Sequence, residues 1–98
     1  MRRTAYRYTF ETDVSMKEVR NSLSLATIAA EGIYGHVRVT LDAFFRLDLD
    51  DRMCLIDGST AVGECIAAVF TEFLARDFGE DGFKVKRTEE TIPTGDES

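Results

Sequence analysis

Residues 37–56 read VRVTLDAFFRLDLDDRMCLI, and the pattern of these residues is the main indication of the fold class. From Val37 to Leu49 the odd positions are apolar while the even positions are mostly charged or polar, which is the period of a strand with one buried face. The acidic pair Asp50-Asp51 interrupts the pattern before a second apolar run, Met53–Ile56. A short polar break between two strand-like runs predicts a β-hairpin at the centre of the chain.

The length of this break decides which residues lie opposite each other. With a two-residue loop, four side chains face one another in two pairs and point into the core: Leu47 with Cys54, and Phe45 with Ile56. The other face of the sheet then carries three apolar side chains between charged neighbours: Phe44, Met53 and Leu55. A three-residue loop would bury Met53 and Leu55 instead, so the composition of the open face depends on the hairpin register.

The segments on either side of the hairpin each predict one strand and one helix. Before it, aromatic residues alternate with polar ones over Tyr6–Phe10, and a capping box at Ser15 begins an apolar stripe that runs to about Gly32. After it, helical spacing extends over 61–78, and the alternating run 83–87 predicts a last short strand.

The resulting order is strand, helix, strand, strand, helix, strand. It predicts an α+β fold, the ferredoxin-like split β-α-β sandwich (β-α-β-β-α-β), in which two helices cover one face of a four-stranded antiparallel sheet. Right-handed crossovers favour the strand order 4-1-3-2. We expect a single domain over residues 1–87 and a disordered acidic tail over 88–98, where the apolar pattern stops.

Composition narrows the function classes. The chain of 98 residues carries a formal charge of -6 and its basic residues are scattered, so we do not expect nucleic-acid binding. Cys54 and Cys65 lie outside any metal-binding spacing, and the single histidine, His36, has no nucleophile near it in the sequence. We therefore expect no enzyme activity, metal or cofactor. Because no secretory signal or membrane-spanning run is evident, we expect a cytoplasmic protein that does not bind membranes.

An apolar patch on the open sheet face predicts self-association. The patch formed by Phe44, Met53 and Leu55 is rimmed by charge, and two-fold dimers are the commonest oligomers, so we expect a homodimer through this face. The apolar stripe of the first helix is wider than one sheet face needs, because it includes Leu25, Ile28 and Ala29. Two interpretations of this width remain open. Either a partner subunit covers part of this helix or the core is thick.

The turn Gly58-Ser59-Thr60 is a second candidate site. It precedes the second long helix, where free backbone N–H groups and hydroxyls can hold an anion. An ordinary helix cap is the simpler interpretation. The sequence therefore predicts a small binding or assembly module that could also contact another protein, and the alternative is a domain that senses an anionic metabolite at this turn.

Overall fold

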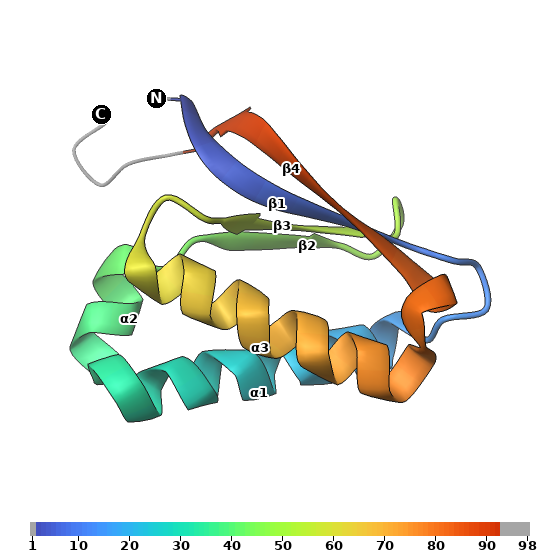
Figure 1. Ribbon diagram of the computed structural model, residues 1–98, viewed down its shortest axis with the longest axis horizontal. Coiled ribbons are helices and arrows are strands. Elements are labelled where there is room, and N and C mark those ends of the chain that lie inside the picture. The colour runs from blue at the N-terminus through green and yellow to red at the C-terminus, as the bar shows by residue number, and fades with distance from the viewer. Residues whose placement is uncertain (1, 93–98) are drawn as a thin grey trace.

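The computed structural model describes residues 2–92 as an α+β domain in which the helices lie on one side of an antiparallel sheet (Figure 1). The sheet order is β2-β3-β1-β4, which is 4-1-3-2 when counted from the β4 edge. The elements along the chain are β1 (Arg2–Phe10), α1 (Met16–Tyr34), α2 (His36–Asp42), β2 (Phe45–Asp48), β3 (Met53–Asp57), α3 (Ala61–Phe78), the 3-10 turn η1 (Glu80–Gly82) and β4 (Phe83–Thr91).

The central hairpin has the predicted register. Phe45 pairs with Ile56 and Leu47 pairs with Cys54 across β2 and β3. Cys54 and Ile56 are fully buried in the core, and Leu47 packs against it. The prediction for Phe45 is wrong, because this side chain is 39% exposed. It lies on β2, an edge strand that has no described strand on its outer side.

The first half of the alternating stretch is helical rather than extended. Val37 and Leu41 are both odd-numbered, but they are also four residues apart, so their spacing suits one face of a helix equally well. Within α2, the Arg38 guanidinium donates to the Asp42 carboxylate at 2.9 Å. Gly35, with φ of +86°, ends α1 and lets the chain turn directly into α2.

The main core fills the space between the sheet and the helices α1 and α3. Val19, Leu23 and Ala26 of α1 are buried at helical spacing, as the stripe predicts. From the sheet, the ring of Tyr8 meets the ring of Phe70 on α3 edge to face, with the ring centroids 4.9 Å apart. This contact packs the second half of β1 against the middle of α3.

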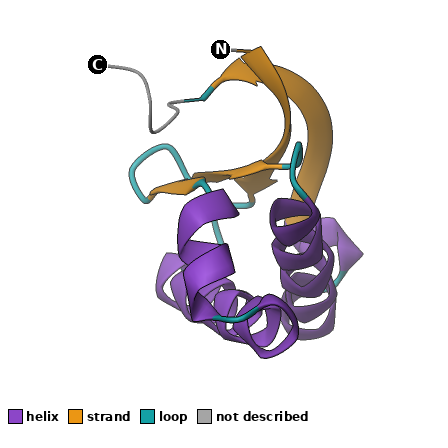
Figure 2. Ribbon diagram, turned by 90° about the vertical axis from the view of Figure 1, so that its left-hand side faces the viewer, coloured by secondary structure: helices purple, strands orange, loops and turns teal. Residues whose placement is uncertain are grey.

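The sheet face away from the helices is not bare, which corrects the predicted interface. The long strands β1 and β4 bend over this face (Figure 2), as expected for strongly twisted strands. They enclose a second, smaller core of Ala5, Met53, Leu55 and Ile92, with Phe44 packed against it. Met53 and Leu55 are only 7% and 2% exposed, so the chain itself covers the residues on which the predicted dimer contact depended.

The end of the domain also lies beyond its predicted limit at residue 87. β4 continues to Thr91 and Ile92 is buried, so residues 88–92 belong to the folded unit. Ion pairs hold this end against β1: Glu89 lies 3.8 Å from Arg2, and Glu90 lies 3.3 Å from Arg7. The remaining part of the predicted tail, 93–98, lies outside the described residues. Over 2–92, no helix has the length and apolar character needed to cross a membrane.

Candidate functional site

The turn Gly58-Ser59-Thr60 lies at the start of α3, and its donors are engaged within the chain. Ser59 donates to the Asp57 carboxylate from its backbone N–H at 2.9 Å and from its hydroxyl at 2.6 Å. The Thr60 hydroxyl accepts the backbone N–H of Gly63 at 2.9 Å and so caps the helix. Because Asp57 is 1% exposed and already holds Ser59, an external anion would have to compete with a fixed carboxylate.

The single histidine and the hairpin-tip carboxylate of Asp48 also serve local structure. The His36 ring nitrogen Nδ1 lies 2.5 Å from the Glu31 carboxylate on the exposed surface at the junction of α1 and α2. The Asp48 carboxylate accepts the backbone N–H of Asp51 at 3.0 Å and closes the hairpin turn. Among the described residues, no group of three or more His, Cys, Asp or Glu side chains is placed to hold a metal ion.

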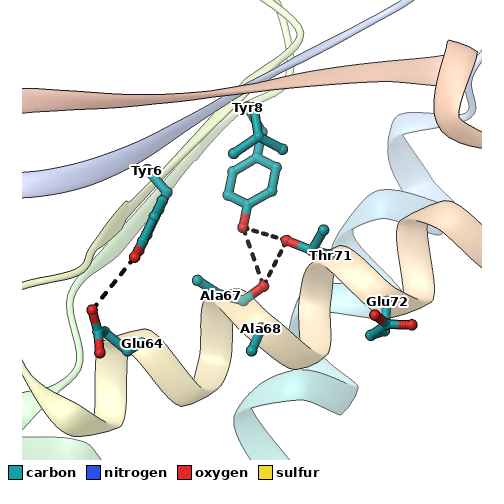
Figure 3. Close-up of a pocket in the computed structure, with 8 residues that line it drawn as sticks. Tyr6, Tyr8, Glu64, Ala67, Ala68, Thr71 and Glu72 are labelled. Carbon is teal, nitrogen blue, oxygen red and sulfur yellow. Dashed lines mark hydrogen bonds between the residues drawn. The ribbon is translucent and has the colours of Figure 1, made fainter.

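A cleft of about 350 Å³ separates α3 from the strands β1 and β4 (Figure 3), and we call it the α3–β4 cleft. Its apolar surface comes from three small or medium side chains: Ala67, Ala68 and Val85. Its polar groups come from five residues: Tyr6, Tyr8, Glu64, Thr71 and Glu72. The short alanine side chains leave the space beside the sheet open, and the volume lies in the range of small-molecule sites.

Tyr8 forms the inner wall of the cleft, and its hydroxyl is held in place. The Thr71 hydroxyl donates to the Ala67 carbonyl at 2.7 Å. The Tyr8 hydroxyl lies 2.8 Å from the Thr71 oxygen and 3.2 Å from the same carbonyl (Figure 3). Burial raises the pKa of Tyr8 to about 12, so the phenol stays neutral over the physiological range. Because Tyr8 is fully buried, its ring is a fixed, uncharged part of the cleft wall, and the half-buried Tyr6 is the aromatic residue that a ligand can reach.

Tyr6 and two glutamates form the outer wall. The Tyr6 hydroxyl donates to the Glu64 carboxylate at 3.4 Å, and both Glu64 and Glu72 are exposed on α3 (Figure 3). No lysine, arginine or histidine is among the lining residues. The strand register places one base, Arg87, next to the cleft, because Arg87 pairs with Tyr6 across β1 and β4. The cleft thus combines aromatic and carboxylate groups, which is the chemistry that attracts organic cations.

Sequence reasoning did not identify this cleft, although part of its signal is local. The α3 residues that line it are 64, 67, 68, 71 and 72, a run of three- and four-residue steps that marks one helix face. This face carries small and polar side chains where a core-facing stripe would carry large apolar ones. Tyr6 and Tyr8 were expected only as alternating residues of a half-buried strand.

The outer surface of α1 and α2 is unusually apolar. Leu25 and Ile28 are 54% and 60% exposed, so a thick core does not account for them. Three further large apolar side chains of α1 and α2 are exposed, and we call the five together the helical apolar face: Leu25, Ile28, Ile33, Val37 and Leu41. A shallow groove of about 430 Å³ between α1 and β2 adjoins it at Ile28.

No family model, curated protein or solved structure matches this chain. We therefore infer the function from the geometry of the α3–β4 cleft.

Proposed function

We propose that the protein is a small binding and assembly module that holds an organic cation in the α3–β4 cleft. The observation that carries this proposal is the pairing of the half-buried Tyr6 with two exposed carboxylates, Glu64 and Glu72, around a space with no base among its described lining residues. An ammonium or guanidinium group gains about 0.5–2 kcal/mol from an aromatic face, and a nearby carboxylate adds a charge-assisted hydrogen bond.

The apolar part of the cleft narrows the ligand class. Ala67, Ala68 and Val85 offer hydrocarbon surface between the carboxylates of Glu64 and Glu72. Because these carboxylates stand eight residues apart on α3, they are about 12 Å apart along the helix axis. A short aliphatic amine or diamine, or a guanidinium compound of similar length, matches a site with an apolar middle and acidic ends.

Binding without chemical conversion is the activity that these groups support. The Tyr8 hydroxyl is engaged by Thr71 and Ala67, and burial raises its pKa to about 12, so it is a poor general base at neutral pH. The alternative of an anionic metabolite at Ser59 and Thr60 receives less support, because Asp57 and Gly63 engage these two residues. We also propose that the fold is ferredoxin-like, with α2 as an additional short helix, on the basis of its element order and sheet order.

Titration with n-butylammonium chloride tests the proposal, with n-butanol as the uncharged control of the same length. The chain contains three tyrosines and no tryptophan, so its intrinsic fluorescence comes from tyrosine and should respond to a cation beside Tyr6. We expect butylammonium but not butanol to bind. Glu64→Gln and Glu72→Gln should each weaken binding about 3- to 10-fold, and Ala68→Leu should abolish it by filling the cleft.

Asp50→Asn is the matched control, since it removes the same charge from the exposed hairpin tip, away from the lining residues. It should leave the affinity unchanged. If Asp50→Asn weakened binding as much as Glu72→Gln, the amine would be responding to the overall negative charge and the cleft would not be the site. Equal binding of butanol would also overturn the proposal.

A further inference from the structure

β4 has a free edge with outward-facing backbone groups. It is the last strand of the described sheet, and just before its first pair with β1 the Glu11 N–H donates to the Gly82 carbonyl at 3.0 Å. In antiparallel strands the residues that bond to the neighbour alternate, so the even-numbered residues of β4 bond to β1. Beyond Phe83, at the buried start of the strand, four odd-numbered residues therefore direct their backbone N–H and C=O groups away from the sheet: Val85, Arg87, Glu89 and Thr91.

The side chains of this edge change sign at its middle. Residues 84–91 read KVKRTEET, with bases before Thr88 and acids after it. If two copies of β4 run antiparallel with Thr88 opposite Thr88, Arg87 of each copy faces Glu89 of the other. Lys86 of each copy likewise faces Glu90 of the other. Every charged pair in this register is attractive, and opposite charges across strands stabilise a sheet.

From this pattern we infer that two copies of the chain join along β4 about a two-fold axis at Thr88, which makes one continuous sheet. Charged residues on an edge strand normally prevent such pairing, because like charges repel a second copy. In β4 the change of sign favours pairing, because opposite charges of the two copies face each other. Because β4 alternates its faces, Arg87 and Glu89 meet on the helix side, and Lys86 and Glu90 meet on the other side.

The same charges exclude the neighbouring arrangements. Sliding one strand by two residues places Arg87 opposite Arg87 in one direction and Glu89 opposite Glu89 in the other. Pairing the two strands in parallel and in register places every charge opposite itself. The antiparallel register centred on Thr88 therefore avoids like-charge pairs that these alternatives contain.

A second copy would also complete the α3–β4 cleft, a consequence that rests on the proposed function. Val85 lines the cleft from β4, and Thr91 of the second copy would lie beside it. Glu89 of the second copy would face Arg87, the base opposite Tyr6, and would offset its charge next to a bound cation. Each cleft would thus be bounded by both copies.

Solution mass tests the dimer, measured by light scattering on the wild type, Arg87→Glu, Glu89→Arg and an equimolar mixture of the two variants. The wild type should be a dimer. Each single substitution places like charges opposite each other at both Arg87–Glu89 pairs, so dimer affinity should fall at least about 10-fold. The mixture should dimerise again, because the introduced glutamate of one variant would face the introduced arginine of the other, and the unchanged Arg87 and Glu89 would face each other. Native mass spectrometry would identify the mixed dimer.

Recovery on mixing separates this inference from simple loss of structure, because a misfolded variant would not regain a partner. A monomeric wild type at the highest concentration measured would overturn the inference. So would a mixture that stays monomeric, or a dimer that survives both charge changes and separates on Ile28→Glu in the helical apolar face. Because the masses are measured without amine, and Ala68→Leu should leave the dimer intact, failure of the cation site and failure of the dimer are distinguishable.

Discussion

Gly63→Ala is expected to lower the free energy of unfolding by about 3 kcal/mol, since overpacking against a fixed backbone strains the native state. A Cβ atom at position 63 would lie 1.8 Å from the Asp57 carbonyl oxygen and 3.1 Å from the Thr60 hydroxyl. Asp57 cannot move aside easily. Its N–H donates to the Phe44 carbonyl at 2.9 Å, and its carboxylate pairs with Arg3 at 3.2 Å. The extra methyl group would therefore push α3 away from the end of β3.

Gly32→Ala is the matched control for this substitution. Gly32 lies within α1, and apart from its chain neighbours and the α1 backbone no heavy atom of the described residues lies within 4 Å of the position that a Cβ would take. Alanine favours a helix interior over glycine by about 1 kcal/mol, so this change should raise the free energy of unfolding by up to that amount. Urea unfolding followed by circular dichroism would measure both. A Gly63→Ala variant as stable as the wild type would mean that α3 is not packed tightly on Asp57.

The parts of the fold that could be predicted are those with a local signal. The hairpin register is as predicted, although the turn spans four residues, 49–52, rather than two, because pairing Asp48 with Met53 keeps the same register. Parity then placed Cys54 and Ile56 in the core. The helix α2 was missed because Val37 and Leu41 satisfy both a period of two and a spacing of four. Over so few residues the apolar pattern alone cannot choose between the two structures.

The parts that could not be predicted depend on distant segments. The end of β4 carries no apolar alternation, and Glu89 and Glu90 are held by Arg2 and Arg7 near the start of the chain. The burial of Met53 depends on the bending of β1 and β4 over the sheet, which accumulates from strand twist and leaves no mark in the alternation of either strand. For this reason the chain itself covers the sheet face that the alternation pattern predicted to be exposed.

The candidate site, too, is only partly predictable from the sequence. The small and polar face of α3 at 64, 67, 68, 71 and 72 is visible in the sequence, and so are Tyr6 and Tyr8 as neighbours on one face of a strand. The sequence does not show that this helix face lies beside the β4 edge, or that Ala67 and Ala68 leave a gap there. That gap results from the relative placement of β1, β4 and α3.

Raising the pH from 8 to 12 is expected to lower the free energy of unfolding by several kcal/mol. Cys54 and Tyr8 are both 0% exposed. Burial raises the pKa of Cys54 from 9.0 to about 12 and that of Tyr8 from 10.0 to about 12. In the unfolded chain these groups lose their protons near the lower values, whereas the folded chain keeps them until about pH 12. Between these values the folded chain binds more protons than the unfolded chain, so stability falls as the pH rises.

The pKa changes correspond to about 4 kcal/mol for Cys54 and about 3 kcal/mol for Tyr8 across the full window. Both contributions are present at pH 8, begin to fall near pH 9 for Cys54 and near pH 10 for Tyr8, and are lost as the pH passes about 12. Urea unfolding at pH 8, 9, 10 and 11 would measure the slope. Cys54→Ala should flatten it from about pH 9 and Tyr8→Phe from about pH 10, even though each variant is less stable at pH 8. A slope that neither variant changes would place the alkaline-sensitive protons elsewhere and would contradict the burial of these two side chains.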